Sequence, residues 1–234
     1  MPSGSLAVIW QEPFLLLYLL VVVASLWKYP RYYDTPLRYL PILLMYTLLT
    51  EVMGTIIRDD NNFSINLSEF YYNNNWLIFN IYNLIFFVYF GYVYSLYLSA
   101  PGWKKAARAG LVLFLASSVV NAFLEDFRVF SQLYAYTVGG ILMIVLAWAY
   151  LRQQFRLRQR IPLHGNLLVW ISLGILVFYI GYLPIKYIRA SVANLEMFSM
   201  PELIRPLHLG LILFMYGCFL IGLLRLHRMK NPGL

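Results

Sequence analysis

The side chains of this sequence that could bind a small molecule are acids, amides, a phenol and an imidazole, all placed within long apolar stretches. Glu51 lies in the second of these stretches, Asn80, Tyr82 and Asn83 lie in the third, and His208 opens the last. Ionisable side chains in such surroundings are costly to bury and usually face an interior or a cavity. Carboxylate, carboxamide and imidazole groups donate or accept hydrogen bonds, so this set indicates a polar binding site.

Seven apolar stretches position these side chains. They run over about 6–27, 36–57, 76–98, 107–124, 129–151, 163–185 and 203–224, and each has about the length that a helix needs to cross a bilayer. The chain is 61% hydrophobic and only 12% charged, whereas an average soluble domain has about 25% charged residues. We therefore predict an all-α integral membrane protein, a single domain of seven transmembrane helices over residues 1–234.

The basic residues predict the orientation of this bundle because they fall in alternate gaps. Those gaps carry Lys28, Arg31 and Arg38, then Lys104, Lys105 and Arg108, then Arg152, Arg156, Arg158 and Arg160, and finally Arg225, Arg228 and Lys230. Lys and Arg are retained on the cytoplasmic side of membranes, so the N-terminus is expected outside and the C-terminus in the cytoplasm. The net charge of +8 is then expected to face anionic lipid rather than nucleic acid. The short tails are typical of a bacterial inner (plasma) membrane protein.

With this orientation the strongly polar side chains gather in the outer halves of the spans. The predicted ligand-binding residues are Glu51, Asn80, Tyr82, Asn83, Asn121, Tyr179, Tyr182, Arg205 and His208. The residues expected at the outer rim of the same site are Glu12, Glu125, Asp126 and Lys186. The inner halves are mainly aliphatic and aromatic. This predicts a cavity that is open to the outer face and closed below by apolar side chains, with the mixed lining typical of ligand pockets.

Each of these residues also has a purely structural interpretation. Glu51 could be one partner of a buried pair, and His208 could pack between helices. Asn80 and Asn83 could bond across helices, at roughly 1 kcal/mol or less each. The charged residues near the interface could be solvated helix ends. The common depth of the set, more than any one member, favours the cavity.

The sequence offers little for catalysis, metal binding or a cofactor. Neither H-E-x-x-H nor G-x-S-x-G occurs. The histidines are His164, His208 and His227, and the predicted topology keeps them apart. Cys218 is the only cysteine, so no intramolecular disulfide can form. We expect neither an enzyme nor a resident metal or cofactor.

The predicted function is that of a membrane receptor or sensor. A small ligand would enter from the outer face, and the basic inner loops would signal to a cytoplasmic or membrane partner. This architecture resembles compact bacterial seven-helix sensor modules. One alternative is a secondary transporter of a small solute, coupled to protons through Glu51, although the apolar inner half and the lack of an internal repeat disfavour it. Another is a structural or assembly subunit whose polar residues bind a partner's helices.

Overall fold

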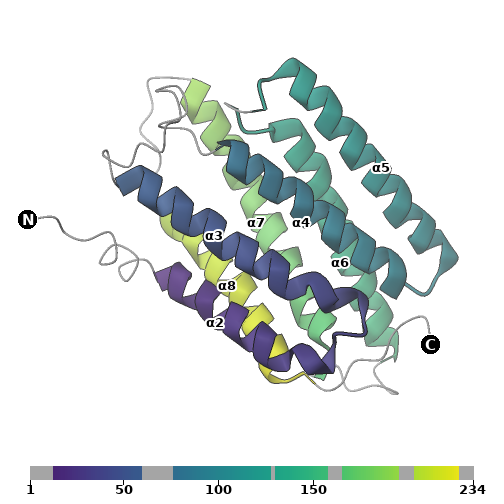
Figure 1. The fold of residues 1–234 in the computed structure, drawn as a ribbon. Helices are drawn as coiled ribbons and strands as arrows, with labels where there is room; N and C mark the ends of the chain where they lie inside the picture. Colours follow the sequence, from purple (N-terminus) through teal and green to yellow (C-terminus); the bar gives the residue numbers. More distant parts are fainter. Residues whose placement is uncertain (1–12, 60–75, 128–129, 158–164, 195–202, 227–234) are drawn as a thin grey trace, which may run out of the picture.

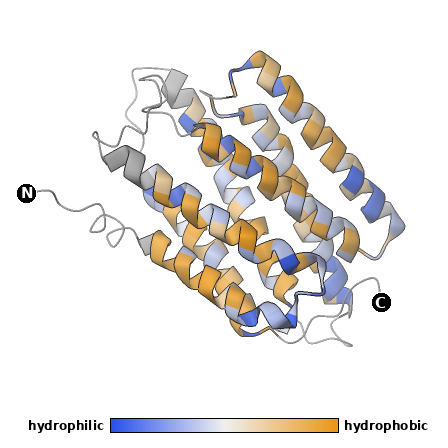
Figure 2. Cartoon of the chain, in the orientation of Figure 1, coloured by the Kyte–Doolittle hydropathy of each residue, from blue (hydrophilic) through white to orange (hydrophobic). Residues whose placement is uncertain are grey.

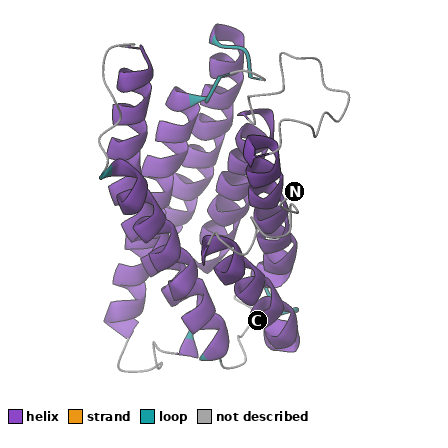
Figure 3. Ribbon diagram, turned by 90° about the vertical axis from the view of Figure 1, so that its left-hand side faces the viewer, coloured by secondary structure: helices purple, strands orange, loops and turns teal. Residues whose placement is uncertain are grey.

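A computed structural model describes residues 13–59, 76–127, 130–157, 165–194 and 203–226, and every regular element in these ranges is helical (Figure 3). The helices are α2 (Pro13–Lys28), α3 (Leu40–Asp59), α4 (Trp76–Tyr97), α5 (Pro101–Leu124), α6 (Leu133–Leu157), α7 (Leu167–Asn194) and α8 (Ile204–Leu224). Two short 3-10 helices, η1 (Tyr29–Arg31) and η2 (Pro36–Tyr39), connect α2 to α3. The all-helical class predicted from the sequence is confirmed.

Six stretches are long and apolar enough to cross a membrane, one in each of α2, α4, α5, α6, α7 and α8. This supports a multi-pass membrane protein in a lipid bilayer. The remaining long helix, α3, is not one of the six; it contains Glu51 and ends with Arg58 and Asp59. Apolar residues cover most of the helix lengths, and hydrophilic residues concentrate near helix ends, as in the first turns of α5 (Figure 2).

The helices form a ring with one helix outside it. Neighbours pack in the order α2, α3, α4, α6, α7 and α8, and α8 closes the ring against α2. Helix α5 packs against α4 and α6, which also contact each other, so α5 lies at the edge of the bundle (Figure 1). The C-terminal ends of α3, α5 and α7 and the N-terminal ends of α4, α6 and α8 lie at one end of the bundle (Figure 1). We call it the predicted outer end, and the opposite one the predicted inner end.

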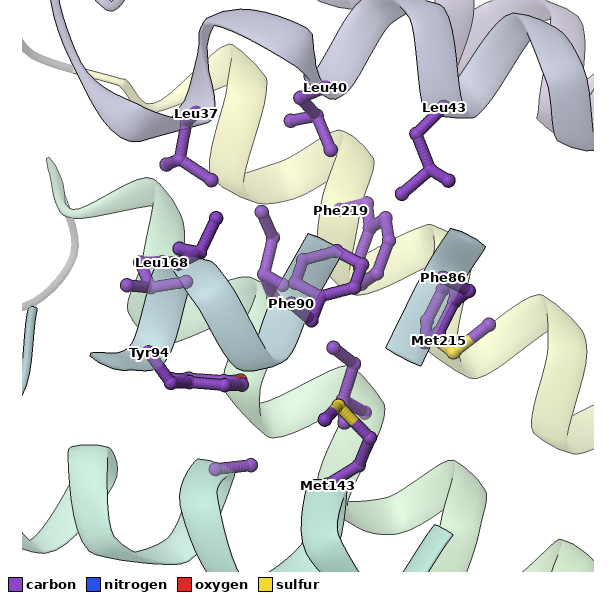
Figure 4. Close-up of a cluster of buried hydrophobic side chains, with 14 of the residues drawn as sticks. Leu37, Leu40, Leu43, Phe86, Phe90, Tyr94, Met143, Leu168, Met215 and Phe219 are labelled. Atoms are coloured by element: carbon purple, nitrogen blue, oxygen red, sulfur yellow. The ribbon is translucent and has the colours of Figure 1, made fainter. Parts of the chain in front are cut away.

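The centre of the ring is filled by aromatic side chains. Phe86, Phe87, Phe90 and Phe219 are each at most 2% exposed, and we call them the aromatic layer. The Phe86 and Phe90 ring centroids are 4.7 Å apart, and the Phe90 and Phe219 centroids are 6.3 Å apart. Met143 and Met215 pack beside the layer (Figure 4). Tyrosine rings, including those of Tyr82 and Tyr179, pack against this layer, which lies between the two ends of the bundle.

Helix α7 extends further than the sequence indicates. The expected span ends near residue 185, with an outer loop from Lys186 and a short interfacial helix over about 192–198. Instead α7 continues through Pro184 to Asn194, and residues 195–198 lie outside the described ranges. Proline is tolerated within membrane helices because neighbouring groups can satisfy the backbone carbonyl that it leaves free. The continuation places Lys186 inside a helix rather than in a loop.

Candidate functional site

Two of the predicted amides tie the connection between α5 and α6 to the bundle. The Nδ2 of Asn80 donates to the carbonyls of Phe127 (2.9 Å) and Phe130 (2.8 Å), and its Oδ1 accepts from the Gln132 N–H at 3.4 Å. A buried amide with these bonds has few left for a ligand.

Asn121 completes the same connection from α5. Its Oδ1 accepts from the Ala135 N–H at 3.1 Å, and its Nδ2 donates to the Glu125 carboxylate at 2.9 Å. Asn121 is 1% exposed. Its interactions, like those of Asn80, are accounted for by the fold.

A cavity of about 240 Å³ lies beside these amides, between α4, α5 and α6 at the predicted outer end. Its lining residues are Asn80, Asn83, Leu84, Phe87, Phe114, Leu115, Ser118, Val119, Ala122, Phe127, Gln132, Ala135 and Tyr136. Most of them are apolar. Of the predicted ligand-binding residues, the structure brings Asn80 and Asn83 to this cavity.

Two amides at the cavity retain unused hydrogen-bonding capacity. Asn83 is half-buried and forms no hydrogen bond with any residue in the part of the chain that the structure describes. Gln132 is 6% exposed, and its Oε1 is buried without a partner in the same part of the chain. The Gln132 Nε2 donates to the Glu125 carbonyl at 3.5 Å. This bond assigns the nitrogen and oxygen positions of the amide, and the oxygen is the unpaired atom. Buried polar groups are normally paired, so the Gln132 Oε1 points to a missing partner, and the half-buried Asn83 amide offers further capacity at the same cavity.

Tyr136 connects this cavity to a group of aromatic and cationic side chains on α7 and α8. We call Tyr136, Tyr179, Tyr182, Lys186 and His208 the aromatic–cation cluster. The Lys186 ammonium lies 3.7 Å from the Tyr136 ring centroid, within cation–π distance. The Tyr182 ring packs against Tyr136 at 5.8 Å and stacks on the His208 ring at 4.4 Å. The cavity wall thus contacts α7 directly, and Tyr182 links it to His208 on α8.

The charged neighbour of Lys186 is a second cation. Arg189 lies one turn further along α7, and its charge acts on both Lys186 and His208. The cation–π contact with the Tyr136 ring partly compensates the burial of the Lys186 ammonium beside this guanidinium.

Glu51 belongs to a neighbouring network of tyrosines on the α2–α3 side. Its charge acts on the phenols of Tyr18, Tyr82 and Tyr182. The Tyr82 hydroxyl accepts from the Thr47 hydroxyl at 3.3 Å and lies 3.2 Å from the Tyr216 hydroxyl. Tyr182 also belongs to the aromatic–cation cluster, where it stacks on His208, so the network around Glu51 adjoins that cluster.

The remaining predicted residues lie at or beyond the margin of this region. Arg205 and Asp126 are exposed, Glu125 is bonded to Asn121, and Glu12 lies outside the described residues. Lys186, expected at the rim, instead packs inside the cluster.

The residues of the region that were not among the predicted ligand-binding or rim residues include Tyr18, Gln132, Tyr136, Arg189 and Tyr216. Gln132 and Tyr136 share the depth of the others in the sequence, so the depth pattern itself could have identified them. Arg189 was not predicted because the expected span ends near residue 185, which would place this residue in a loop.

Comparison with known proteins identifies no relative, because no protein-family model, curated protein or solved structure matches the chain. Within the described ranges, no three His, Cys, Asp or Glu side chains come together as a metal site. The geometry of the predicted outer end is therefore the basis for a functional proposal.

Proposed function

We propose that this protein is a membrane receptor whose ligand binds in the cavity between α4, α5 and α6 and alters the packing of α7. The observation that carries the proposal is the double role of Tyr136. Its side chain lines the cavity, and its ring holds the Lys186 ammonium of α7 at 3.7 Å. Any ligand that moves Tyr136 changes the environment of Lys186.

Helix α7 is suited to carry such a change across the membrane. It has 28 residues, which at 1.5 Å per residue is about 42 Å, more than the thickness of a hydrocarbon core. It packs closely against both α6 and α8. A ligand that binds one arrangement of these helices more tightly shifts the population toward it. A partner at the predicted inner end would then detect the new arrangement of the basic loops.

The aromatic layer favours a receptor over a carrier. Phe86, Phe87, Phe90 and Phe219 fill the ring between the two ends and are almost fully buried. A carrier has to open a path through this layer for its solute, whereas a receptor only has to shift its helices. Proton-coupled uptake through Glu51 would need that path as well.

The receptor proposal includes the seven-span topology with the N-terminus outside. It can be tested with single cysteines at exposed positions in a Cys218→Ser background, one replacing Asp126 and the other replacing Arg156. An impermeant thiol reagent added outside should label the first position and not the second. Labelling with the reverse pattern would invert the topology and place the cavity on the cytoplasmic side.

Cys218 tests the signalling step itself, since it is the only cysteine and is buried in α8. We expect 1-octanol, as a small probe of the cavity, to change the rate at which Cys218 reacts with a thiol reagent in the native protein. Lys186→Met should abolish this change while leaving octanol binding in place. The same change in the variant would show that Lys186 does not transmit binding to α8.

Vesicle uptake separates the receptor from the carrier. Reconstituted protein should not accumulate labelled amino acids, sugars or carboxylates under a proton gradient. Accumulation of one of them that is lost in Glu51→Gln would replace the receptor proposal with transport.

A further inference from the structure

The cavity combines an apolar lining with a small amount of unused polar capacity. Leu84, Phe87, Phe114 and Val119 are typical of its walls. The lining also contains the amides of Asn83 and Gln132, which have unpaired groups within the described residues. An unpaired amide in an apolar site is unfavourable, and a ligand that pairs with it removes that cost. The lining therefore fits a molecule with an apolar body and one hydrogen-bonding group.

The position of the cavity indicates that this molecule comes from the bilayer. One wall is α5, the helix at the edge of the bundle (Figure 1). Two lining residues of α5, Leu115 and Val119, are 42% and 57% exposed and apolar. A third lining residue of α5, Ala122, is also exposed and has a small apolar side chain. In a membrane this face of α5 is in contact with lipid, so the cavity adjoins the hydrocarbon phase.

The size of the cavity limits the ligand. Its volume of about 240 Å³ exceeds that of the roughly 150 Å³ apolar cavity that accepts benzene. It is below the roughly 300–1,000 Å³ of pockets for drug-sized molecules. A whole lipid does not fit, whereas a medium-chain or single-ring molecule does.

We infer that the cavity binds a small membrane-dissolved amphiphile, an apolar molecule with a single hydroxyl group, and that the hydroxyl pairs with the Asn83 amide. A carboxamide offers both a donor and an acceptor, and a hydroxyl can satisfy one of each. This inference rests on the proposed receptor function and specifies the ligand class that it senses. It also changes the expected route of entry, from the outer aqueous face to the bilayer.

Two isomers test the hydroxyl directly. 1-Octanol and 1-methoxyheptane have the same formula, but only the alcohol can donate a hydrogen bond. Binding to the full-length protein in nanodiscs is measured as the rise in unfolding temperature, read from a dye that reacts with Cys218 once it is exposed. At equal mole fraction in the bilayer we expect octanol to bind about 3- to 10-fold more tightly, the range that one net hydrogen bond supports.

Matched variants test whether octanol binds in the cavity. Asn83→Leu, of similar shape, should reduce the affinity for octanol to that for the ether. Ser95→Ala, a polar-to-apolar exchange at the other end of α4, should keep the difference. Ala122→Leu should weaken both isomers by filling the cavity. Ala116→Leu, an exposed position of α5 that does not line the cavity, should weaken neither.

The outcomes distinguish the inference from the function on which it rests. If the isomers bind equally and Ala122→Leu still weakens both, the hydroxyl assignment is wrong while the cavity remains a ligand site. If neither isomer binds, or if Ala122→Leu has no effect, the inference fails and the receptor proposal loses its binding site.

Discussion

The two ends of the bundle bury polar groups in different ways. At the predicted inner end several buried groups are neutral and bonded to one another, although Lys28 is also buried there. The Tyr94 hydroxyl lies 2.9 Å from the Ser172 hydroxyl, and the Asn166 amide donates to the Tyr150 hydroxyl at 3.0 Å. At the predicted outer end there are charges, in Glu51, Lys186 and Arg189, and a cavity lined by amides with unused capacity.

The outer end differs in the cavity that its polar groups line, rather than in the number of polar groups. The inner end also contains a buried hydroxyl, that of Tyr89, without a partner in the described residues. At the membrane boundary there, the Tyr32 hydroxyl donates to the Ser25 carbonyl at 2.7 Å. Burial raises the pKa of Tyr32, so this phenol remains a neutral donor at physiological pH. Bonded neutral groups stabilise one arrangement, whereas the Lys186–Tyr136 pair lies at the cavity wall and can adjust to a ligand.

Alanine at the glycines of α6 and α7 should show that the inner end is the more rigid of the two. A Cβ at Gly174 would lie 2.9 Å from the backbone carbonyl oxygen of Met215 on α8, which cannot move without displacing the helix. At Gly140, near the outer end, the closest atoms belong to the flexible Leu183 side chain, at 2.9 Å. We expect Gly174→Ala to lower the free energy of unfolding by about 1–3 kcal/mol and Gly140→Ala by less.

Gly217 supplies the control for this pair. A Cβ there meets no atom within 4 Å, so Gly217→Ala should be neutral or stabilising by roughly 0.5–1 kcal/mol. Unfolding is followed by dye reaction at Cys218 in detergent. A Gly140→Ala protein that is less stable than Gly174→Ala would contradict the proposed contrast in rigidity.

Two double-mutant cycles, one at each end, measure the contrast in bonding. At the outer end Lys186→Met is combined with Tyr136→Leu, and the coupling energy should be about 1–2 kcal/mol, as for a partly desolvated cation–π pair. At the inner end Tyr94→Phe is combined with Ser172→Ala, with an expected coupling of about 0.5–1.5 kcal/mol.

The response of these cycles to a ligand is more informative than their absolute size. Saturating 1-octanol should change the Lys186–Tyr136 coupling and leave the Tyr94–Ser172 coupling unchanged. Equal changes at both ends would mean that the ligand stabilises the whole bundle without acting through Tyr136.

The helices were largely predictable from the sequence because membrane crossing depends on the length and composition of a local stretch. The predicted span over 76–98 became α4 at Trp76–Tyr97, and 203–224 became α8 at Ile204–Leu224. The end of α7 was misplaced because Pro184 and Lys186 together resemble the end of a span. The bonds that allow the helix to continue depend on packing, which a single stretch does not reveal.

The placement of polar side chains along each helix was predictable, whereas their contacts across helices were not. The common depth of Glu51, Tyr82 and His208 follows from counting residues along each span. Whether an amide binds a ligand or a loop depends on its neighbours across helices, so Asn80 and Asn83 looked equivalent in the sequence although only Asn83 is left unpaired among the described residues. The cavity requires knowledge of how α5 packs against α4 and α6.

The smallest expected effect on stability, and the most specific effect on function, belongs to Glu51. Glu51→Gln preserves the shape of the side chain and removes its charge from Tyr18, Tyr82 and Tyr182. Hydrogen bonds between the side chains of membrane helices contribute roughly 1 kcal/mol or less each. The free energy of unfolding should therefore change by no more than that. The octanol-dependent change in Cys218 reactivity should nevertheless be altered, because the charge acts on Tyr182, which packs against Tyr136 and His208.

Thr50→Val, a buried polar position one residue away on α3, is the matched control and should leave the response intact. A normal response in Glu51→Gln, with Glu51→Leu also folded and responsive, would exclude Glu51 from the site and confine signalling to Tyr136 and Lys186.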